Sequence, residues 1–178
     1  MLYEYNFNRP KISPTAFISD SATIIGNVTI GDYCYIGPGA VIRSERLPIV
    51  IGDETAVEDG VIIHTGGAKS NGTIIGKRVT IGHGAIIHAN RIDDNANIGM
   101  GAIISLFSEV GEYAVVAEGA VVRSGQVIPP RVVIGGTPAK VLRELMEKDI
   151  DAWSKSKDMY VQVVKNCNTP ELFKPVER

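Results

Sequence analysis

The chain has 178 residues, with 18 basic and 20 acidic side chains and a formal net charge of −2. This length fits one domain with enough core to fold unaided, and the balanced charge gives no electrostatic basis for binding nucleic acid. No segment has the ~20 apolar residues of a membrane span, and the first ten residues lack the basic and apolar regions of a signal peptide. We therefore expect a cytoplasmic protein with no nucleic-acid or membrane partner.

Isoleucine recurs every six residues in the first quarter of the chain, at positions 12, 18, 24, 30, 36 and 42. Small residues follow most of them by four positions: Ala16, Ala22, Val28, Cys34 and Ala40. One bulky and one small inward residue fit a narrow triangular coil with about six residues on each face and about eighteen in each turn. A sandwich or barrel of short strands has a period of two instead. We therefore predict a parallel β-helix.

Glycine often follows the aliphatic residue of the repeat, as in Ile81-Gly82. We expect these glycines to adopt unusual dihedral angles at the corners of the coil.

The repeat ends near Thr137-Pro138, which has the pattern of a helix N-cap followed by proline at the first helical position. Two apolar stripes of helical period follow, formed by Val141, Leu142, Leu145, Met146, Ile150 and Trp153 and then by Tyr160, Val163, Val164 and Cys167. We predict a β-helix domain over residues 1–137 and a helical segment over residues 138–178 that packs along the coil. One kinked helix or two helices are expected, with any break between Ser154 and Lys157.

Two insertions interrupt the period. Nine residues instead of six lead from Ile42 to Ile51, and the extra three surround Leu47. Twelve residues lead from Ile63 to Ile75, and the segment TGGAKSNG between them has no apolar inward residue. We interpret that segment as a loop extruded from the coil.

When these insertions are subtracted, the residues that follow Ile42, Ile63 and Ile87 stack at one corner of successive turns. They are Arg43, His64 and His88, and neighbouring strands lie about 4.8 Å apart. Two imidazoles at this spacing can share one metal ion, because Zn–N bonds are roughly 2.0–2.1 Å long. A single histidine on such a face is usually solvated, but all three histidines of this chain fall between residues 64 and 88.

His83 lies on the preceding face of the coil. The five residues from His83 to His88 span at most about 16 Å, so we expect His83 not to reach an ion held by His64 and His88 in the same subunit. A threefold assembly would bring His83 of one subunit to the His64/His88 corner of the next and create three equivalent sites. Three protein ligands with an open fourth position are typical of catalytic zinc.

His64 together with His83-Gly-Ala-Ile-Ile-His88 resembles the gamma-class carbonic anhydrases and the related ferripyochelin-binding-protein-like hexapeptide-repeat proteins. The resemblance extends over nearly the whole chain, through GGTPAKVLREL. It implies a left-handed β-helix, a homotrimer with metal sites at the subunit interfaces, and Zn²⁺ as the cofactor, with Fe²⁺ or Co²⁺ as alternatives. The implied activity of this lyase is hydration of a small molecule, carbon dioxide, to bicarbonate by a metal-bound hydroxide.

The resemblance also implies catalytic roles for Glu58, Arg43 and Asp59. Arg43 matches an arginine that orders the subunit interface through a carboxylate, here Glu45 or Asp59. The chain departs from the family pattern where Ala56 and Glu58 replace an asparagine and a glutamine. Glu58 therefore either acts as a general base or raises the pKa of the metal-bound water.

The segment from Thr65 to Thr73 contains no Asp or Glu. It therefore lacks the acidic proton-shuttle residue of the best-studied branch of the family.

Two other functions remain open. A hexapeptide acyltransferase would use acetyl-coenzyme A, with His83 or His88 as the general base, although one histidine would then suffice. A non-catalytic trimeric metal-binding scaffold is consistent with Ala56 and Glu58.

Overall fold

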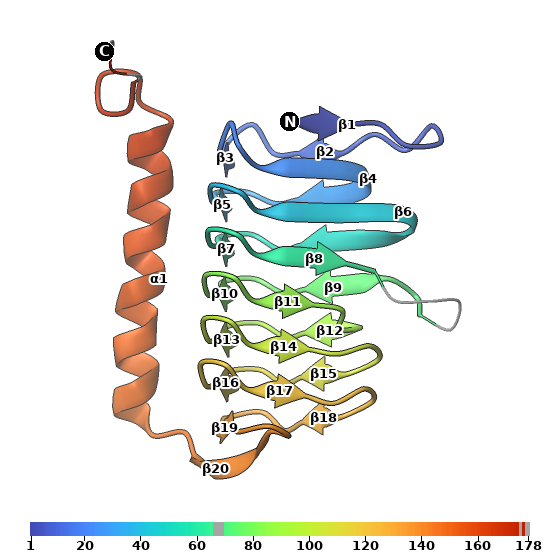
Figure 1. The fold of residues 1–178 in the computed structure, drawn as a ribbon. Helices are drawn as coiled ribbons and strands as arrows, with labels where there is room; N and C mark the ends of the chain where they lie inside the picture. The colour runs from blue at the N-terminus through green and yellow to red at the C-terminus, as the bar shows by residue number, and fades with distance from the viewer. Residues whose placement is uncertain (66–69, 175, 177–178) are drawn as a thin grey trace.

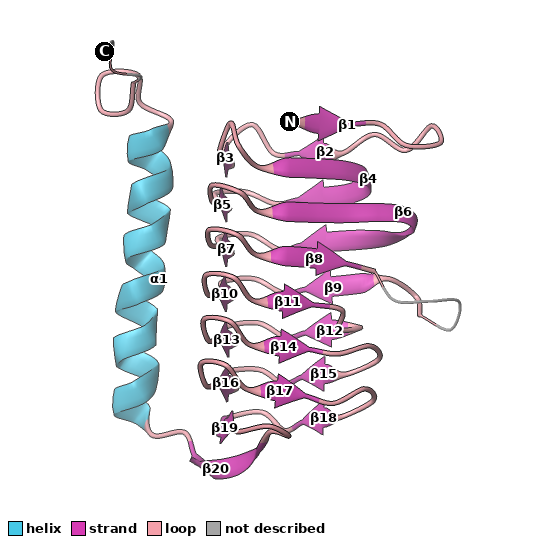
Figure 2. Ribbon diagram, viewed as in Figure 1, coloured by secondary structure: helices cyan, strands magenta, loops and turns pink. Residues whose placement is uncertain are grey.

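The computed structural model describes residues 1–65, 70–174 and 176. The chain winds into a parallel β-helix of about seven turns, and one long helix runs beside it (Figures 1 and 2). The left-handed parallel β-helix predicted from the repeats and the resemblance is confirmed. The predicted loop of the second insertion includes residues 66–69, which lie outside the described part of the chain.

The coil has three faces. The first contains the start of β4 (Thr23–Ile30) and of β6 (Val41–Ile51), then β8 (Ile62–His64), β11 (Ile86–Ile87), β14 (Ile103–Ile104) and β17 (Val121–Val122). The second contains β2 (Lys11–Ile12), the ends of β4 and β6, β9 (Thr73–Ile75), β12 (Arg91–Ile92), β15 (Glu109–Val110) and β18 (Val127–Ile128). The third contains β3 (Phe17–Ile18), β5 (Tyr35–Ile36), β7 (Ala56–Val57), β10 (Thr80–Ile81), β13 (Asn97–Ile98), β16 (Val115–Val116) and β19 (Val132–Gly135). β1 (Leu2–Tyr3) pairs with the start of β4.

The core is a column of aliphatic side chains inside the coil. Ile24, Ile36 and Ile63 are fully buried, as are the small residues Cys34 and Ala40 that alternate with them. Burying one such aliphatic side chain stabilises a fold by roughly 1.5–3 kcal/mol. The repeat therefore supplies a continuous hydrophobic core along the coil.

The glycines of the repeat serve two separate purposes. Gly82, which follows Ile81, has an ordinary φ, but a Cβ there would lie 2.8 Å from the backbone nitrogen of Met100 in the next turn. The positive φ occurs two residues later, at Gly84, where φ is +68°. The expectation that the glycine after the aliphatic residue supplies the unusual dihedral angle is therefore wrong. Glycine is needed at that position because adjacent turns pack too closely for a side chain.

The predicted helix start at Thr137-Pro138 is wrong. β20 (Lys140–Glu144) instead pairs antiparallel with β19, the last strand of the third face. This strand covers the open edge of the coil, which would otherwise expose unpaired backbone groups. Val141 and Leu142 of the first predicted stripe accordingly lie on a strand and are exposed.

The one helix among the described residues is α1 (Glu147–Cys167), and it follows the third face back toward the N-terminal end of the coil (Figure 1). At its first turn, the side chain of Asp149 accepts a hydrogen bond from the backbone N–H of Met146. The helix continues through Ser154–Lys157, where a break was expected. In the described ranges no helix has the length and apolar composition needed to cross a membrane. The division into domains at residue 137 stays a prediction.

Candidate metal centre

Two of the three histidines stack at one corner of the coil. Arg43 pairs with His64, and Ile63 pairs with Ile87, so His64 and His88 follow their isoleucines on adjacent turns. Their ring centroids lie 5.0 Å apart and the rings are nearly perpendicular, at 79°. The predicted column of Arg43, His64 and His88 is therefore confirmed as an arrangement of the chain.

The first insertion places a carboxylate beside this column. The pairing of β6 with β4 shifts after Ser44, and Glu45 lies in the extra segment. One oxygen of Glu45, Oε1, is 2.6 Å from Nη1 of Arg43, and the other, Oε2, is 3.1 Å from Nε2 of His64. Of the two carboxylates considered for Arg43, Glu45 is therefore the one in contact within the chain. Burial opposes ionisation of Glu45, but the hydrogen bond with His64 and the charge of Arg43 lower its pKa overall.

His88 has an unused nitrogen. Its Nδ1 is buried and has no hydrogen-bond partner among the described residues, and an unpaired buried polar atom is costly. Burial lowers the pKa of His88, and the charges of His64 and Arg43 lower it further. The imidazole is thus kept neutral, with a lone pair available, which is the form that binds a metal ion.

His83 belongs to a second cluster, at the corner between β10 and the next strand. Its Nδ1 accepts a hydrogen bond of 3.3 Å from the backbone N–H of Asp59 and lies 3.8 Å from Oδ2 of the same residue. Its Nε2 lies 3.1 Å from Oε2 of Glu58. In residues 1–65, 70–174 and 176 of a single chain, no group of three His, Cys, Asp or Glu side chains is arranged to hold an ion. The three histidines of one chain therefore lie in two separate clusters.

Glu58 is held from the far side by helix α1. It is only 7% exposed, and its Oε1 accepts a hydrogen bond of 2.5 Å from the hydroxyl of Tyr160. Burial raises the pKa of Tyr160, and the hydrogen bond to Glu58 raises it further. The sequence interpretation assigned Tyr160 only to a packing stripe and missed this contact. An inward tyrosine needs a hydrogen-bond partner for its hydroxyl. The place of Tyr160 in an inward stripe was therefore the signal for a polar partner on the coil.

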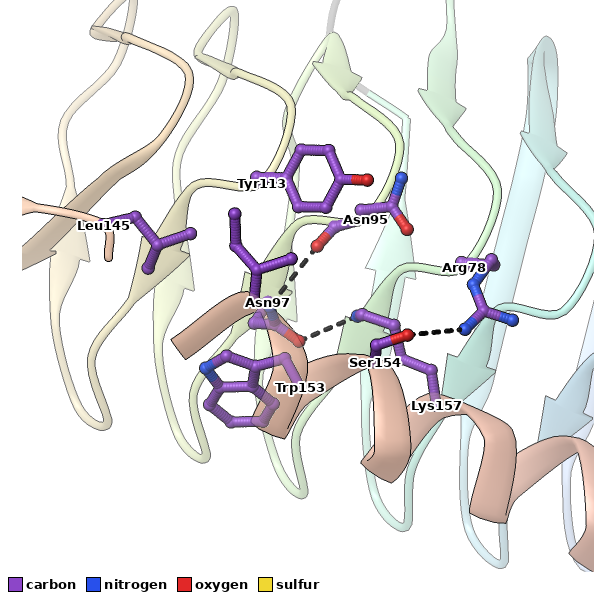
Figure 3. A pocket seen from close by; sticks show the side chains of 9 residues that line it. Arg78, Asn95, Asn97, Tyr113, Leu145, Trp153, Ser154 and Lys157 are labelled. Atoms are coloured by element: carbon purple, nitrogen blue, oxygen red, sulfur yellow. Dashed lines mark hydrogen bonds between the residues drawn. The ribbon is translucent and has the colours of Figure 1, made fainter. Parts of the chain in front are cut away.

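A cavity of about 260 Å³ lies between α1 and the third face, and Lys157 is among the residues that line it (Figure 3). Lys157 is 3% exposed. Its Nζ donates hydrogen bonds to Oδ1 of Asn97 at 2.8 Å, Oγ1 of Thr80 at 3.2 Å and the carbonyl oxygen of Ala96 at 3.3 Å. All three acceptors are uncharged. Burial therefore lowers the pKa of Lys157 to about 7, and the nearby charge of Arg78 contributes.

The sequence interpretation missed Lys157 because it treated the run from Ser154 to Lys157 as a break. The spacing of Trp153, Lys157, Tyr160 and Val164 in fact follows one face of a continuous helix. A lysine inside such a stripe was the signal of a buried charge.

The free energy of unfolding should rise as pH increases from about 7 to about 10.5, at up to about 1.4 kcal/mol per pH unit. In this window Lys157 has lost its proton in the folded chain but keeps it when unfolded, so the unfolded state binds more protons. Lys157→Met should remove this contribution. Urea denaturation of both proteins between pH 7 and pH 9 measures it. Lys155→Met, at an exposed position, is the matched control. If the free energy of unfolding changed with pH at the same slope in all three proteins, the lowered pKa of Lys157 would be contradicted.

The fold and the corner histidines define a β-helix protein of the hexapeptide-repeat class. Residues 9–44 match the family described as bacterial transferase hexapeptide (six repeats). A carbonic anhydrase from Geobacillus kaustophilus is 41% identical over 162 residues, which cover 91% of this chain and 88% of that protein.

The mitochondrial gamma carbonic anhydrase 2 of Arabidopsis thaliana is 34% identical, over 86% of this chain and 57% of its own length. A solved structure of a hexapeptide transferase family protein from Anaplasma phagocytophilum superimposes with a TM-score of 0.84 and 35% identity, covering 92% of this chain and 96% of that chain. The chain therefore belongs to the gamma-class carbonic anhydrase family of hexapeptide-repeat proteins.

Proposed function

We propose that the protein is a homotrimeric metalloenzyme that hydrates carbon dioxide to bicarbonate. In this proposal His64 and His88 of one subunit and His83 of the next hold one ion at each subunit interface. The observation that carries it is the pair of incomplete sites on one chain: two stacked imidazoles, one with an orphaned nitrogen, and a third imidazole on another corner. The similarity to carbonic anhydrases supports the choice of reaction.

An exposed apolar strip supports the assembly. Ile62, Ile86 and Ile103 lie in register on the outer side of the first face and are 42%, 36% and 38% exposed. Ile62 and Ile86 precede His64 and His88 by two residues and therefore point to the same side, because side chains alternate along an extended chain. Contiguous apolar surface of this kind usually marks an interaction site. A second copy of the chain that covers the strip would also bring its own His83 toward these histidines.

The donor set fits a divalent transition metal. Neutral imidazoles suit Zn²⁺, and they also bind Fe²⁺ and Co²⁺. We propose Zn²⁺ as the resident ion, with Fe²⁺ or Co²⁺ as alternatives. When bound, the ion supplies a hydroxide nucleophile at neutral pH, because coordination lowers the pKa of water to about 7.

The surrounding carboxylates hold the histidines in place. Arg43 fixes Glu45, and Glu45 in turn contacts Nε2 of His64. Asp59 orients His83 through its backbone N–H. Such partners of metal-binding histidines set the tautomer and the direction of the ring. We propose that Arg43 and Asp59 act in this positioning role and that Glu58 acts at the reaction centre itself.

The assembly is tested by sedimentation at micromolar concentration. We expect one species near three times 19.1 kDa, because His83 meets the other two histidines only across an interface. A stable monomer that carries tightly bound metal would contradict the proposal.

The activity is tested by stopped-flow hydration of carbon dioxide with the zinc-loaded and iron-loaded protein. We expect hydration that depends on the ion and stops when a chelator removes it. An acyltransferase, favoured by the similarity to a hexapeptide transferase, would instead bind acetyl-coenzyme A without needing metal. A trimer that binds metal but hydrates no carbon dioxide would indicate a scaffold.

A further inference from the structure

We propose that Glu58 is a fourth protein ligand of the shared ion, acting together with His83 of its own subunit. This inference rests on the proposed function, because it adds a ligand to the same site. The family pattern places a neutral glutamine at this position, so a carboxylate ligand would distinguish this chain from that pattern.

The distance between the two donor atoms supports a shared ion. Oε2 of Glu58 lies 3.1 Å from Nε2 of His83. With metal–ligand bonds of 2.0–2.2 Å, adjacent donor atoms are separated by about 3.0 Å in octahedral and about 3.4 Å in tetrahedral coordination. The observed separation falls between these values. The two atoms therefore already lie at a separation that one shared ion would require.

The backbone of Asp59 fixes the direction of the His83 ring. Nδ1 accepts a hydrogen bond from the backbone N–H of Asp59, which turns Nε2 toward Oε2 of Glu58. A neutral imidazole that binds an ion through Nε2 carries its proton on Nδ1. On metal binding the partner of Nδ1 would therefore change from the N–H of Asp59 to its carboxylate, whose Oδ2 lies 3.8 Å away.

Glu58 also lacks a compensating cation. It is 7% exposed, and in the described part of the chain no Lys or Arg side chain forms an ion pair with it. Its other partners are the hydroxyl of Tyr160 and the backbone N–H of His83. A buried carboxylate normally has a paired charge or a metal ion. The hydrogen bonds fix its orientation, and an ion at Oε2 would supply the missing charge.

Glu45 provides a contrast within the same structure. Its Oε2 is also 3.1 Å from a histidine Nε2, that of His64. However, Glu45 is already paired with Arg43 at 2.6 Å, and its side chain is 28% exposed. Its charge is therefore compensated without an ion, which favours Glu58 and not Glu45 as the ligand.

The test uses the assembled full-length protein loaded with Zn²⁺ or Co²⁺. Competition with a chromophoric chelator measures Zn²⁺ affinity in the native protein, in Glu58→Gln and in Glu45→Gln. Loss of an outer-shell partner alone costs roughly 10–100-fold in affinity. We expect Glu58→Gln to lose at least about this much, and its visible Co²⁺ spectrum to change because one ligand is lost. Glu45→Gln should keep the native spectrum.

A second measurement is the binding of an anion to the ion. Thiocyanate should bind weakly to the native Co²⁺ protein, because a carboxylate fills the position that an anion would take, and more tightly to Glu58→Gln. Strong thiocyanate binding by the native protein, or unchanged affinity and spectrum in Glu58→Gln, would overturn the ligand assignment while leaving the proposed function intact. A native trimer that binds neither ion would instead contradict the proposed function.

Discussion

Replacement of His88 by alanine should reduce the bound metal from about one ion per chain to nearly none. One of the two stacked imidazoles would be lost from the corner, and with it the orphaned nitrogen of His88. The coil should stay folded, because the buried isoleucine column forms the core. Elemental analysis after dialysis measures the metal, and circular dichroism measures the fold.

The matched control for this experiment is Ser105→Ala. Ser105 follows Ile104, which pairs with Ile87, so it occupies the same corner one turn further along the coil. It should keep the native metal content. Undiminished metal in His88→Ala would show that the ligand set is wrong.

Glu58→Gln should raise carbon dioxide hydration at least several-fold and shift the midpoint of the pH–rate profile downward. A carboxylate beside the ion disfavours hydroxide, since two unit negative charges 4 Å apart repel by about 4 kcal/mol at an effective dielectric constant of 20, before the charge of the ion offsets this. If Glu58 also occupies a ligand position, its removal opens that position to water. Stopped-flow assays between pH 6 and pH 9 with equal metal loading measure both effects.

The control for the change in net charge is Glu118→Gln, at an exposed corner of a later turn. Adding Ala56→Asn to Glu58→Gln restores the family pattern, although Ala56 is 2% exposed and a larger side chain must displace its neighbours. If Glu58→Gln instead eliminates activity that the native protein has, Glu58 is a working base and the interpretation of this residue as impairing is wrong.

The period of six was sufficient to predict the coil and the stacking of His64 on His88. In a coil of fixed turn length, residues one turn apart are neighbours, so counting residues and subtracting insertions gives true contacts. The same counting separated His83 from the other two histidines. The two candidate partners of Arg43, Glu45 and Asp59, came from the family resemblance instead, and the structure shows that the insertion brings Glu45 to that corner.

The C-terminal segment could not be predicted in the same way. The residues of β20 have a helical pattern, yet they pair with the exposed edge of the last turn, so a tertiary contact overrides local preference. The contact of Tyr160 with Glu58 joins residues 102 positions apart. It depends on how α1 is placed along the third face, which no repeat encodes. Lys157 was missed for the same reason, since its partners Thr80 and Asn97 lie on that face.

The shared metal site is tested most directly by mixing subunits. Chains with His83→Ala keep the His64/His88 corner, and chains with His88→Ala keep His83, so neither variant should bind metal alone. When equal amounts of the two variants are unfolded together and refolded, three quarters of the trimers should contain both kinds of chain. Each mixed trimer has one interface with a complete site, which gives about one ion for every four chains. A refolded mixture that stays free of metal, or either variant that binds a full complement by itself, would contradict a site built from two subunits.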